Sequence, residues 1–257
     1  MANSTLAIVN SKNRLQESIS SSNFSYNIGS AIEIQELAIK SISLPNTAYN
    51  ITNKNNTLLL NIGGSNFTIN VPIGQYDVSV LTAKITGLLL AQGQSVNITQ
   101  NPTTYKLTWT FTALSFVYIN NNSPLSRYIG FNVDTSQYPN SPTSSFTAPT
   151  LPNLQGTLNY YIASRTLGQG TNALLYNAIQ NLAIIAVIPN NVPYGSIIQY
   201  IPHDILLDLK LYASKQNIQQ IDIVILDTNF NVVDLNGADV ELCFKCYIKS
   251  RVEVFTK

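Results

Sequence analysis

Short stretches in which apolar and polar residues alternate recur along the chain. In residues 105–112 one face carries the apolar side chains of Tyr105, Leu107, Trp109 and Phe111. Lys106 and three threonines occupy the other face. This period of two predicts a strand with one buried and one solvated face. The same pattern appears in residues 24–28, 218–225 and 240–248, so we expect an all-β sandwich.

The first part of the chain predicts a polar arm followed by two strands. Residues 1–22 are rich in serine and asparagine, and we expect them to be mobile or to order only against a partner. Residues 24–28 form a strand that Gly29 ends. Residues 31–44 follow as a second strand, whose apolar phase slips twice, which indicates bulges or a bend between two sheets.

The middle of the chain contains the only convincing helix pattern. Residues 58–62 and 67–71 form a hairpin around Gly63-Gly64. The helix begins at Asp77 or Ser79 and ends at Gly93. Its apolar stripe consists of Val78, Leu81, Ile85, Leu88 and Leu89. We predict that Trp109 is buried by contact between this stripe and the apolar face of residues 105–111.

Further strands are expected on both sides of a long loop. The loop, 132–154, is rich in Pro, Ser and Thr and has no periodicity. The expected strands are 95–99, 105–112, 115–120, 157–166, 181–188, 196–201, 205–212, 218–226 and 239–249. We therefore expect one sandwich core built from residues 24–44 and 157–249, with a small α+β subdomain inserted at about 58–131.

Composition favours self-association and disfavours nucleic-acid binding. Only 11% of the 257 residues are charged, against about 25% in typical soluble proteins. A weakly charged surface permits dense packing of copies, although a codon bias toward Asn and Ile explains the composition equally well. The net charge is +1. The only stretch with an excess of basic residues is at the C-terminus, with Lys245, Lys249, Arg251 and Lys257. We expect no direct contact with nucleic acid.

No segment indicates membrane insertion or secretion. The longest apolar run, 182–188, is far too short to span a bilayer. The N-terminus lacks the pattern of a signal peptide, so we expect the protein to be intracellular when it is made. Several Asn-x-Ser/Thr sequons then represent the by-product of an Asn- and Thr-rich chain.

Cys243 and Cys246 have the spacing of a metal or redox motif but lie in an alternating strand. Residues three apart on a strand face opposite sides. We therefore predict free thiols that bind no zinc.

Other reactive residues are few. His203 is the only histidine, which excludes a histidine-based triad or a multi-histidine metal site within one chain. Asp204 and Asp208 are four residues apart on one face of an expected strand and give only weak support for a paired acid/base role. Gly168-Gln169-Gly170 lacks the strand-turn-helix setting of a phosphate loop. Asp227, Asp234 and Asp239 flank turns, where they either form the turns or bind calcium. We expect no enzymatic activity, no catalytic or metal-binding residue and no cofactor.

Four segments, taken in order, resemble a known family. They are Phe24-Ser25-Tyr26-Asn27-Ile28 with 37–51; Val71-Pro72-Ile73-Gly74-Gln75-Tyr76; Arg127-Tyr128-Ile129-Gly130-Phe131; and 221–227 with Val233-Asp234-Leu235-Asn236-Gly237 and the final strand. Together these segments resemble the penton, or minor capsid, proteins of virophages, polinton-like viruses and related large DNA viruses of protists.

The resemblance implies a jelly roll over residues 23–257, with the insertion at about 58–131, and leaves open whether that region belongs to a second roll. It also implies a homopentamer at the vertices of an icosahedral virion, beside a major capsid protein of the double jelly-roll type. The protein would be made in the host cytoplasm or virus factory.

Two other functions compete with the capsid assignment. One is a glycan- or receptor-binding β-sandwich, such as a fibre head or lectin-like module. Its sugar site would use the aromatic rings of Tyr160, Tyr161, Tyr176, Tyr194 and Tyr200. The other is a β-sandwich hydrolase, which the single histidine and the scattered carboxylates disfavour.

Overall fold

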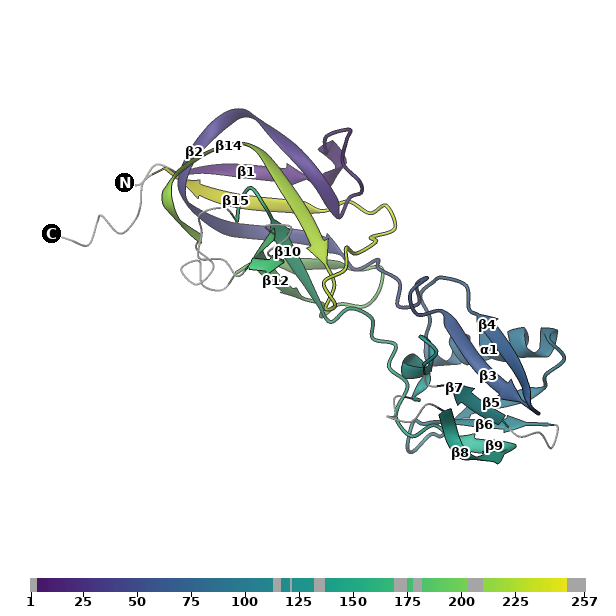
Figure 1. Ribbon diagram of the computed structural model, residues 1–257. Coiled ribbons are helices and arrows are strands. Elements are labelled where there is room, and N and C mark those ends of the chain that lie inside the picture. The colour runs from purple at the N-terminus through teal and green to yellow at the C-terminus, as the bar shows by residue number, and fades with distance from the viewer. Residues whose placement is uncertain are drawn as a thin grey trace. The chain divides into compact units, whose positions relative to one another are not determined.

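The computed structural model describes residues 4–112, 117–120, 122–131, 137–168, 175–177, 182–202 and 210–248. The chain divides into two compact units (Figure 1). The first unit comprises Met1–Ala48 and Thr157–Lys257, and the second comprises Tyr49–Gly156. The second unit thus interrupts the first, and its bounds are wider than residues 58–131.

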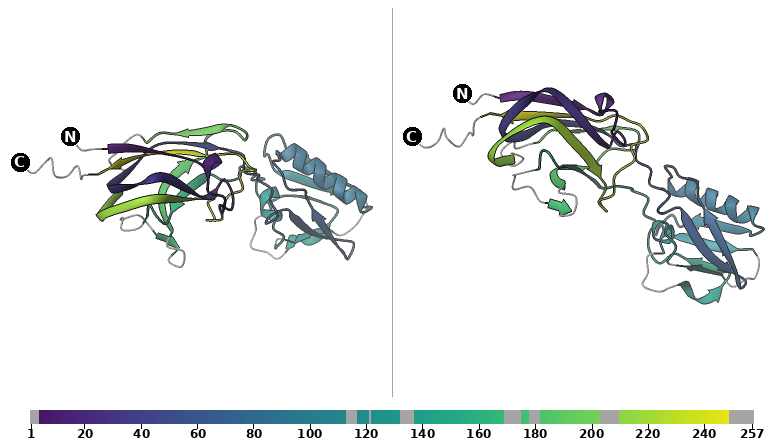
Figure 2. Two further views of the ribbon diagram at one scale, coloured as in Figure 1. Left: turned by 90° about the horizontal axis from the view of Figure 1, so that it is seen from above. Right: turned by 45° about the horizontal axis from the view of Figure 1, so that its top comes forward.

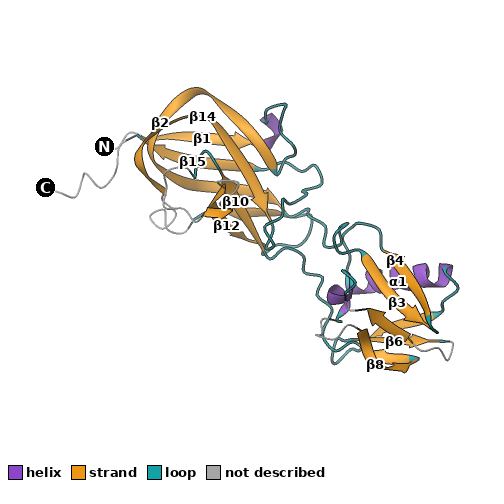
Figure 3. Cartoon of the chain, in the orientation of Figure 1, coloured by secondary structure: helices purple, strands orange, loops and turns teal. Residues whose placement is uncertain are grey.

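In its described residues, the first unit consists of β-strands and one short 3-10 turn, η1 (Ser11–Asn13) (Figure 3). Its strands are β1 (Ser4–Asn10), β2 (Asn23–Pro45), β10 (Asn159–Ser164), β11 (Leu175–Asn177), β12 (Leu182–Pro189), β13 (Ile197–Tyr200), β14 (Lys210–Leu226) and β15 (Glu241–Tyr247). They pair antiparallel in the order β1-β15-β2-β14-β10-β12-β11, and β13 pairs with β2.

The long strand β2 joins the two stretches that the sequence pattern separates. Gly29 has a φ of +84°, a conformation that suits glycine, but hydrogen-bonded pairing continues on both sides of it. The pairing of β2 with β14 shifts register between Ile218 and Gln220. The prediction that Gly29 ends the strand is therefore wrong, because the glycine makes an irregularity within it.

The N-terminal segment is not an unstructured arm. Strand β1 pairs antiparallel with β15 over its whole length, from Ser4 opposite Tyr247 to Asn10 opposite Glu241. Ala7 and Val9 are buried in the core. The expectation that residues 1–22 order only against a partner is wrong for Ser4–Asn10, because this stretch buries apolar side chains against its own chain.

The core of the first unit is filled by the alternating faces of these strands. Strand β15 shows the pattern: Leu242, Phe244 and Cys246 are buried, and Glu241 is exposed. The turn before β15 uses Asn236 and Gly237, both with positive φ, as expected for an Asn-Gly turn.

The described residues of the second unit form two small sheets and one α-helix. Its elements are β3 (Thr57–Ile62), β4 (Ser65–Asn70), α1 (Val78–Ala91), β5 (Val96–Gln100), β6 (Leu107–Phe111), β7 (Val117–Asn120), the 3-10 turn η2 (Ser126–Ile129), β8 (Gln137–Thr143) and β9 (Ser145–Thr147). The sheets have the orders β4-β3-β7-β8 and β5-β6-β9. Figure 2 shows α1 along one side of this unit's strands.

The helix forms as its sequence predicts. The Asp77 side chain caps it by accepting a hydrogen bond from the backbone N–H of Val80 at 2.7 Å. Leu81, Ile85 and Leu89 are buried. Gly93 follows the helix with a φ of +78°, and its N–H donates to Leu90.

Trp109 is completely buried in the same core cluster as the helix stripe, which confirms its predicted burial. Its ring stacks on Phe146 at a centroid distance of 6.4 Å and meets Phe131 edge-on at 5.9 Å. Leu88 is only half-buried, so Leu89 takes the core position beside Leu81 and Ile85.

Two sequence predictions fail in this unit. Tyr105 lies before β6 with a φ of +55° and is 61% exposed, so it does not share the buried face of Trp109. The loop predicted over 132–154 contains strands β8 and β9. Phe146 in β9 is buried against Trp109, so tertiary packing holds a stretch that lacks local periodicity.

Candidate assembly surface

Strand β1 lies at the edge of the large sheet and carries no charged residue. Leu6 and Ile8 point away from the core and are 57% and 56% exposed. Because all four residues from Leu6 to Val9 are apolar, this strand has an apolar outer face as well as a buried one. An apolar outer face at a sheet edge is typical of a protein contact.

The antiparallel register extends this outer face onto β15. Ile8 lies opposite Cys243, and Leu6 lies opposite Lys245. Cys243 is partly buried, and Lys245 places its ammonium group 5.2 Å from the ring centre of Tyr247. We name the surface formed by Leu6, Ile8 and Cys243 the β1 face.

The backbone of β1 is paired on one side. Among the strands that the structure describes, β15 is its only partner (Figure 1). The other edge therefore presents backbone N–H and C=O groups that can accept a further strand. No Pro or Lys in Ser4–Asn10 blocks such pairing. The β1 face and this edge together form the candidate site.

Sequence reasoning assigned residues 1–22 to an arm and missed this surface. The signal was present in the run Leu6-Ala7-Ile8-Val9, which is too apolar for a solvated segment. Its period of two is hidden because both faces are apolar, so only the pairing with β15 reveals it.

The two cysteines lie on opposite faces of β15, as predicted. Cys246 is buried in the core, whereas Cys243 belongs to the β1 face. Burial raises the pKa of the Cys246 thiol to about 11. Burial and the nearby Glu241 carboxylate also raise the pKa of the Cys243 thiol. Neither thiol is activated as a nucleophile.

Asp222 is the most heavily hydrogen-bonded carboxylate in the described residues. It lies in β14 and accepts bonds from the hydroxyl and N–H of Thr166, the N–H of Arg165 and the hydroxyl of Ser164. Burial alone raises the pKa of this carboxyl, but the four bonds outweigh it and hold the pKa below its ordinary value. Asp222 fixes the turn after β10 to β14, a structural role.

Each of the three turn carboxylates has partners within the first unit. Asp227 accepts backbone bonds from Asn229 and Asn231, and Asp234 accepts one from Asn236. Asp239 accepts the Ser11 hydroxyl and lies 3.7 Å from Arg14. In the described part of the chain, no three His, Cys, Asp or Glu side chains are placed to hold one metal ion. The turn-forming interpretation accounts for Asp227 and Asp234, whereas Asp239 connects the segment before β15 to Ser11 and Arg14.

Other predicted positions lie outside the described residues. These are His203, Asp204, Asp208, Gln169 and Gly170. Gly168 is described and packs so closely on β12 that a Cβ there would come within 2.2 Å of the Cβ of Ala183. Close packing explains this glycine.

The structure does not support the tyrosine sugar site as proposed. Tyr160 is fully buried and donates its hydroxyl to Asn46 at 3.0 Å, so its ring cannot stack on a ligand. Burial raises its pKa to about 12. Tyr161 packs on Phe230 at 5.0 Å. Tyr194 is 40% exposed and Tyr200 is half-buried, while the side chain of Tyr176 lies outside the described residues.

None of the helices in the described residues is both long and apolar enough to cross a membrane. No protein-family model matches the sequence, and no curated protein matches it.

The strand arrangement defines a mostly β protein of the jelly-roll type with a second α+β unit inserted into it. A solved structure of this kind, the mavirus penton protein, superposes with a TM-score of 0.55 at 12% sequence identity. The superposition covers 96% of this chain and 100% of that one. The likeness shows a penton-like fold and confirms the all-β jelly-roll class predicted from the sequence.

Proposed function

We propose that this chain is a structural capsid protein that forms homopentamers at the vertices of an icosahedral virion. The observation that carries the proposal is a likeness to a penton protein that extends over both units and leaves no part of that protein unmatched. A shared jelly roll alone would be weaker support, since this architecture serves many functions. A likeness that covers 96% of this chain, and so includes the second unit, is more specific.

The β1 face supports assembly between copies. In a ring of five, each subunit offers one surface and accepts a different one, so the contact is heterologous. A free strand edge beside exposed Leu6 and Ile8 suits such a contact, because backbone pairing supplies order and apolar burial supplies free energy. The low charge of the chain reduces repulsion between the copies.

The proposal extends to the partners and the location. The pentamer contacts surrounding major capsid subunits of the double jelly-roll type, in the virion, after synthesis in the host cytoplasm or virus factory. The chain performs no catalysis, consistent with the structural roles of Asp222 and the turn carboxylates.

Cryo-electron microscopy of purified virions tests the proposal. We expect density for this chain at the five-fold vertices. Finding it at two-fold or quasi-six-fold positions, or not finding it in particles, overturns the assignment. Native mass spectrometry over a concentration series gives the stoichiometry, where a stable dimer or trimer as the largest species contradicts the pentamer.

A further inference from the structure

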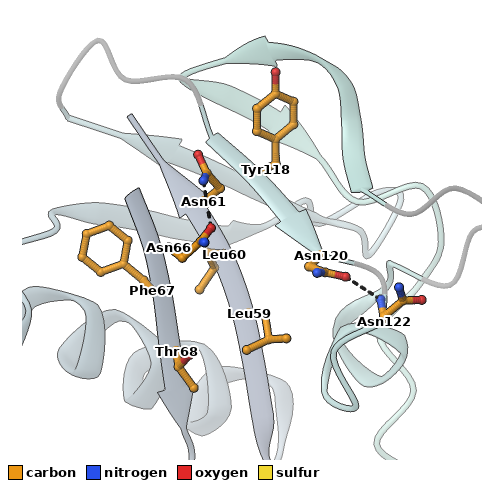
Figure 4. A pocket seen from close by; sticks show the side chains of 9 residues that line it. All are labelled: Leu59, Leu60, Asn61, Asn66, Phe67, Thr68, Tyr118, Asn120 and Asn122. Carbon is orange, nitrogen blue, oxygen red and sulfur yellow. Dashed lines mark hydrogen bonds between the residues drawn. The ribbon is translucent and has the colours of Figure 1, made fainter. Parts of the chain in front are cut away.

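A groove of about 700 Å³ lies on the second unit, over the sheet β4-β3-β7-β8 (Figure 4). Its lining comes from β3, β4 and β7 and from the turn after β7: Leu59, Leu60, Asn61, Asn66, Phe67, Thr68, Tyr118, Asn120 and Asn122. The volume lies within the range of small-ligand sites, about 300–1,000 Å³. No step of the proposed capsid assembly uses this groove.

Strand alternation and register place the polar lining residues on the outer face of the sheet, in two rows that run across β4, β3 and β7. On β3, Leu58, Leu60 and Ile62 are buried, so Leu59 and Asn61 occupy the outer face. Asn61 lies opposite Asn66 on one side and opposite Tyr118 on the other. Antiparallel pairing then puts Asn120 beside Leu59. The ring of Tyr118 and the aliphatic side chain of Leu59 thus lie among the amide side chains of Asn61, Asn66 and Asn120.

Several of these polar groups have few or no partners among the described residues. The side chain of Asn66 makes one bond within the described residues, accepting from Asn61 at 2.9 Å. The Asn120 side chain accepts from the N–H of Asn122 at 2.9 Å and donates to no described residue. The hydroxyl of Tyr118 has no partner among the described residues. These donors and acceptors are available to a ligand.

The lining contains no charged side chain, which narrows the ligand class. Anionic ligands, including nucleic acids, need Lys or Arg to neutralise phosphate or sulfate. A purely apolar ligand would leave the amides unpaired at a cost. A neutral, polyhydroxylated ligand satisfies both conditions, because amides pair with its hydroxyls and an aromatic ring packs on its C–H faces.

We propose that this groove binds a neutral oligosaccharide. The ligand's hydroxyls pair with Asn66 and Asn120, and one sugar ring packs on Tyr118. The proposal does not depend on the vertex location, since the groove lies wholly within the second unit. A capsid protein carrying such a groove would contact glycans as well as other capsid subunits.

A glycan microarray probed with the full-length protein tests the proposal. The array carries neutral hexose and N-acetylhexosamine oligosaccharides beside sulfated and sialylated ones. We expect binding to neutral members, and titration calorimetry with the best neutral oligosaccharide then gives Kd. Binding to none of the neutral members, or to charged members alone, overturns the proposal.

Substitutions locate the binding site. Tyr118→Ala should raise the Kd at least tenfold, and Asn66→Ala should raise it several-fold. The matched controls are Tyr105→Ala and Asn97→Ala, which alter an exposed tyrosine and an exposed asparagine of the same unit outside the groove. Circular dichroism verifies that each variant is folded. Equal Kd values for the groove variants and the controls overturn the proposal even if a glycan binds.

Discussion

The hydroxyl of Thr166 donates a hydrogen bond of 2.6 Å to the carboxylate of Asp222, joining the turn after β10 to the middle of β14. The backbone N–H of Thr166 donates to the same carboxylate at 2.8 Å. All the donors to Asp222 belong to residues 164–166. Folding brings them to the carboxylate, so the folded state stabilises the ionised form of Asp222.

This arrangement makes stability depend on pH. The pKa of Asp222 is lower in the folded protein than in the unfolded chain. The stabilisation from ionised Asp222 is therefore fully present at pH values above the unfolded-state pKa. It is lost as the pH falls through the folded-state pKa. We expect Asp222→Asn to lower the free energy of unfolding at pH 7 by roughly 1–3 kcal/mol, since an amide NH₂ faces the donors. The deficit should shrink as the pH falls below 4.

Urea titrations at several pH values measure this effect. Asp234→Asn is the matched control, because that exposed carboxylate accepts a single hydrogen bond within the described residues, from the N–H of Asn236. An Asp222→Asn deficit that stays constant from pH 7 to pH 3 would contradict the argument.

The burial of Trp109 predicts the stability of the second unit. Trp109→Ala removes the ring that contacts Phe131 and Phe146, and the free energy of unfolding should fall by about 3–5 kcal/mol. Trp109→Phe should cost less, because the indole N–H has no hydrogen-bond partner among the described residues and none is lost. Denaturation followed by circular dichroism checks both variants. Unchanged melting of Trp109→Ala would show that the packing is unimportant.

Local patterns were enough to predict elements whose stabilising contacts are near in sequence. The Asp77 cap, the Gly63-Gly64 hairpin and the Asn236-Gly237 turn depend on a few adjacent residues. The opposite faces of Cys243 and Cys246 follow from strand geometry alone. The buried face around Trp109 was predictable for the same reason.

Elements held by distant partners were not predictable in this way. Strand β1 is defined by β15, more than 200 positions later, and β9 by its packing against β6. The groove on the second unit was also missed, because its lining comes from β3, β4 and β7 and no segment alone resembles a sugar site. The tyrosines selected by composition include the fully buried Tyr160.

Substitutions on the β1 face can test the proposed assembly without a large effect on the stability of the subunit. Deleting residues 1–10 would remove buried Ala7 and Val9 and so destabilise the subunit, which makes the deletion a poor test. The double substitution Leu6→Lys and Ile8→Lys changes only exposed side chains. We expect the melting temperature to change little and the proposed pentamer to weaken strongly, because each of its five contacts would gain buried charge.

Native mass spectrometry and thermal melting of the same samples measure these two effects. Ile73→Lys together with Leu151→Lys provides a matched control, since both are exposed apolar residues of the other unit. If the β1 variant assembled as well as the control variant, the ring contact would lie elsewhere.

Cys243 provides a chemical probe of the same surface in the unmodified chain. It lies opposite Ile8 on the β1 face and is partly accessible, whereas Cys246 is enclosed in the core. Because the pKa of both thiols is raised, reaction with a maleimide should be slow at pH 7 and should become faster as the pH rises.

In the dispersed subunit we expect Cys243 to react first and Cys246 only on unfolding. In the assembled protein Cys243 should be protected as well, because the proposed contact places a neighbouring copy over the β1 face. Peptide mass spectrometry after timed labelling identifies the modified thiol, and urea-unfolded protein gives the full extent of reaction. Equal labelling of Cys243 in dispersed and assembled protein would show that the β1 face remains exposed and would exclude it as the contact between copies.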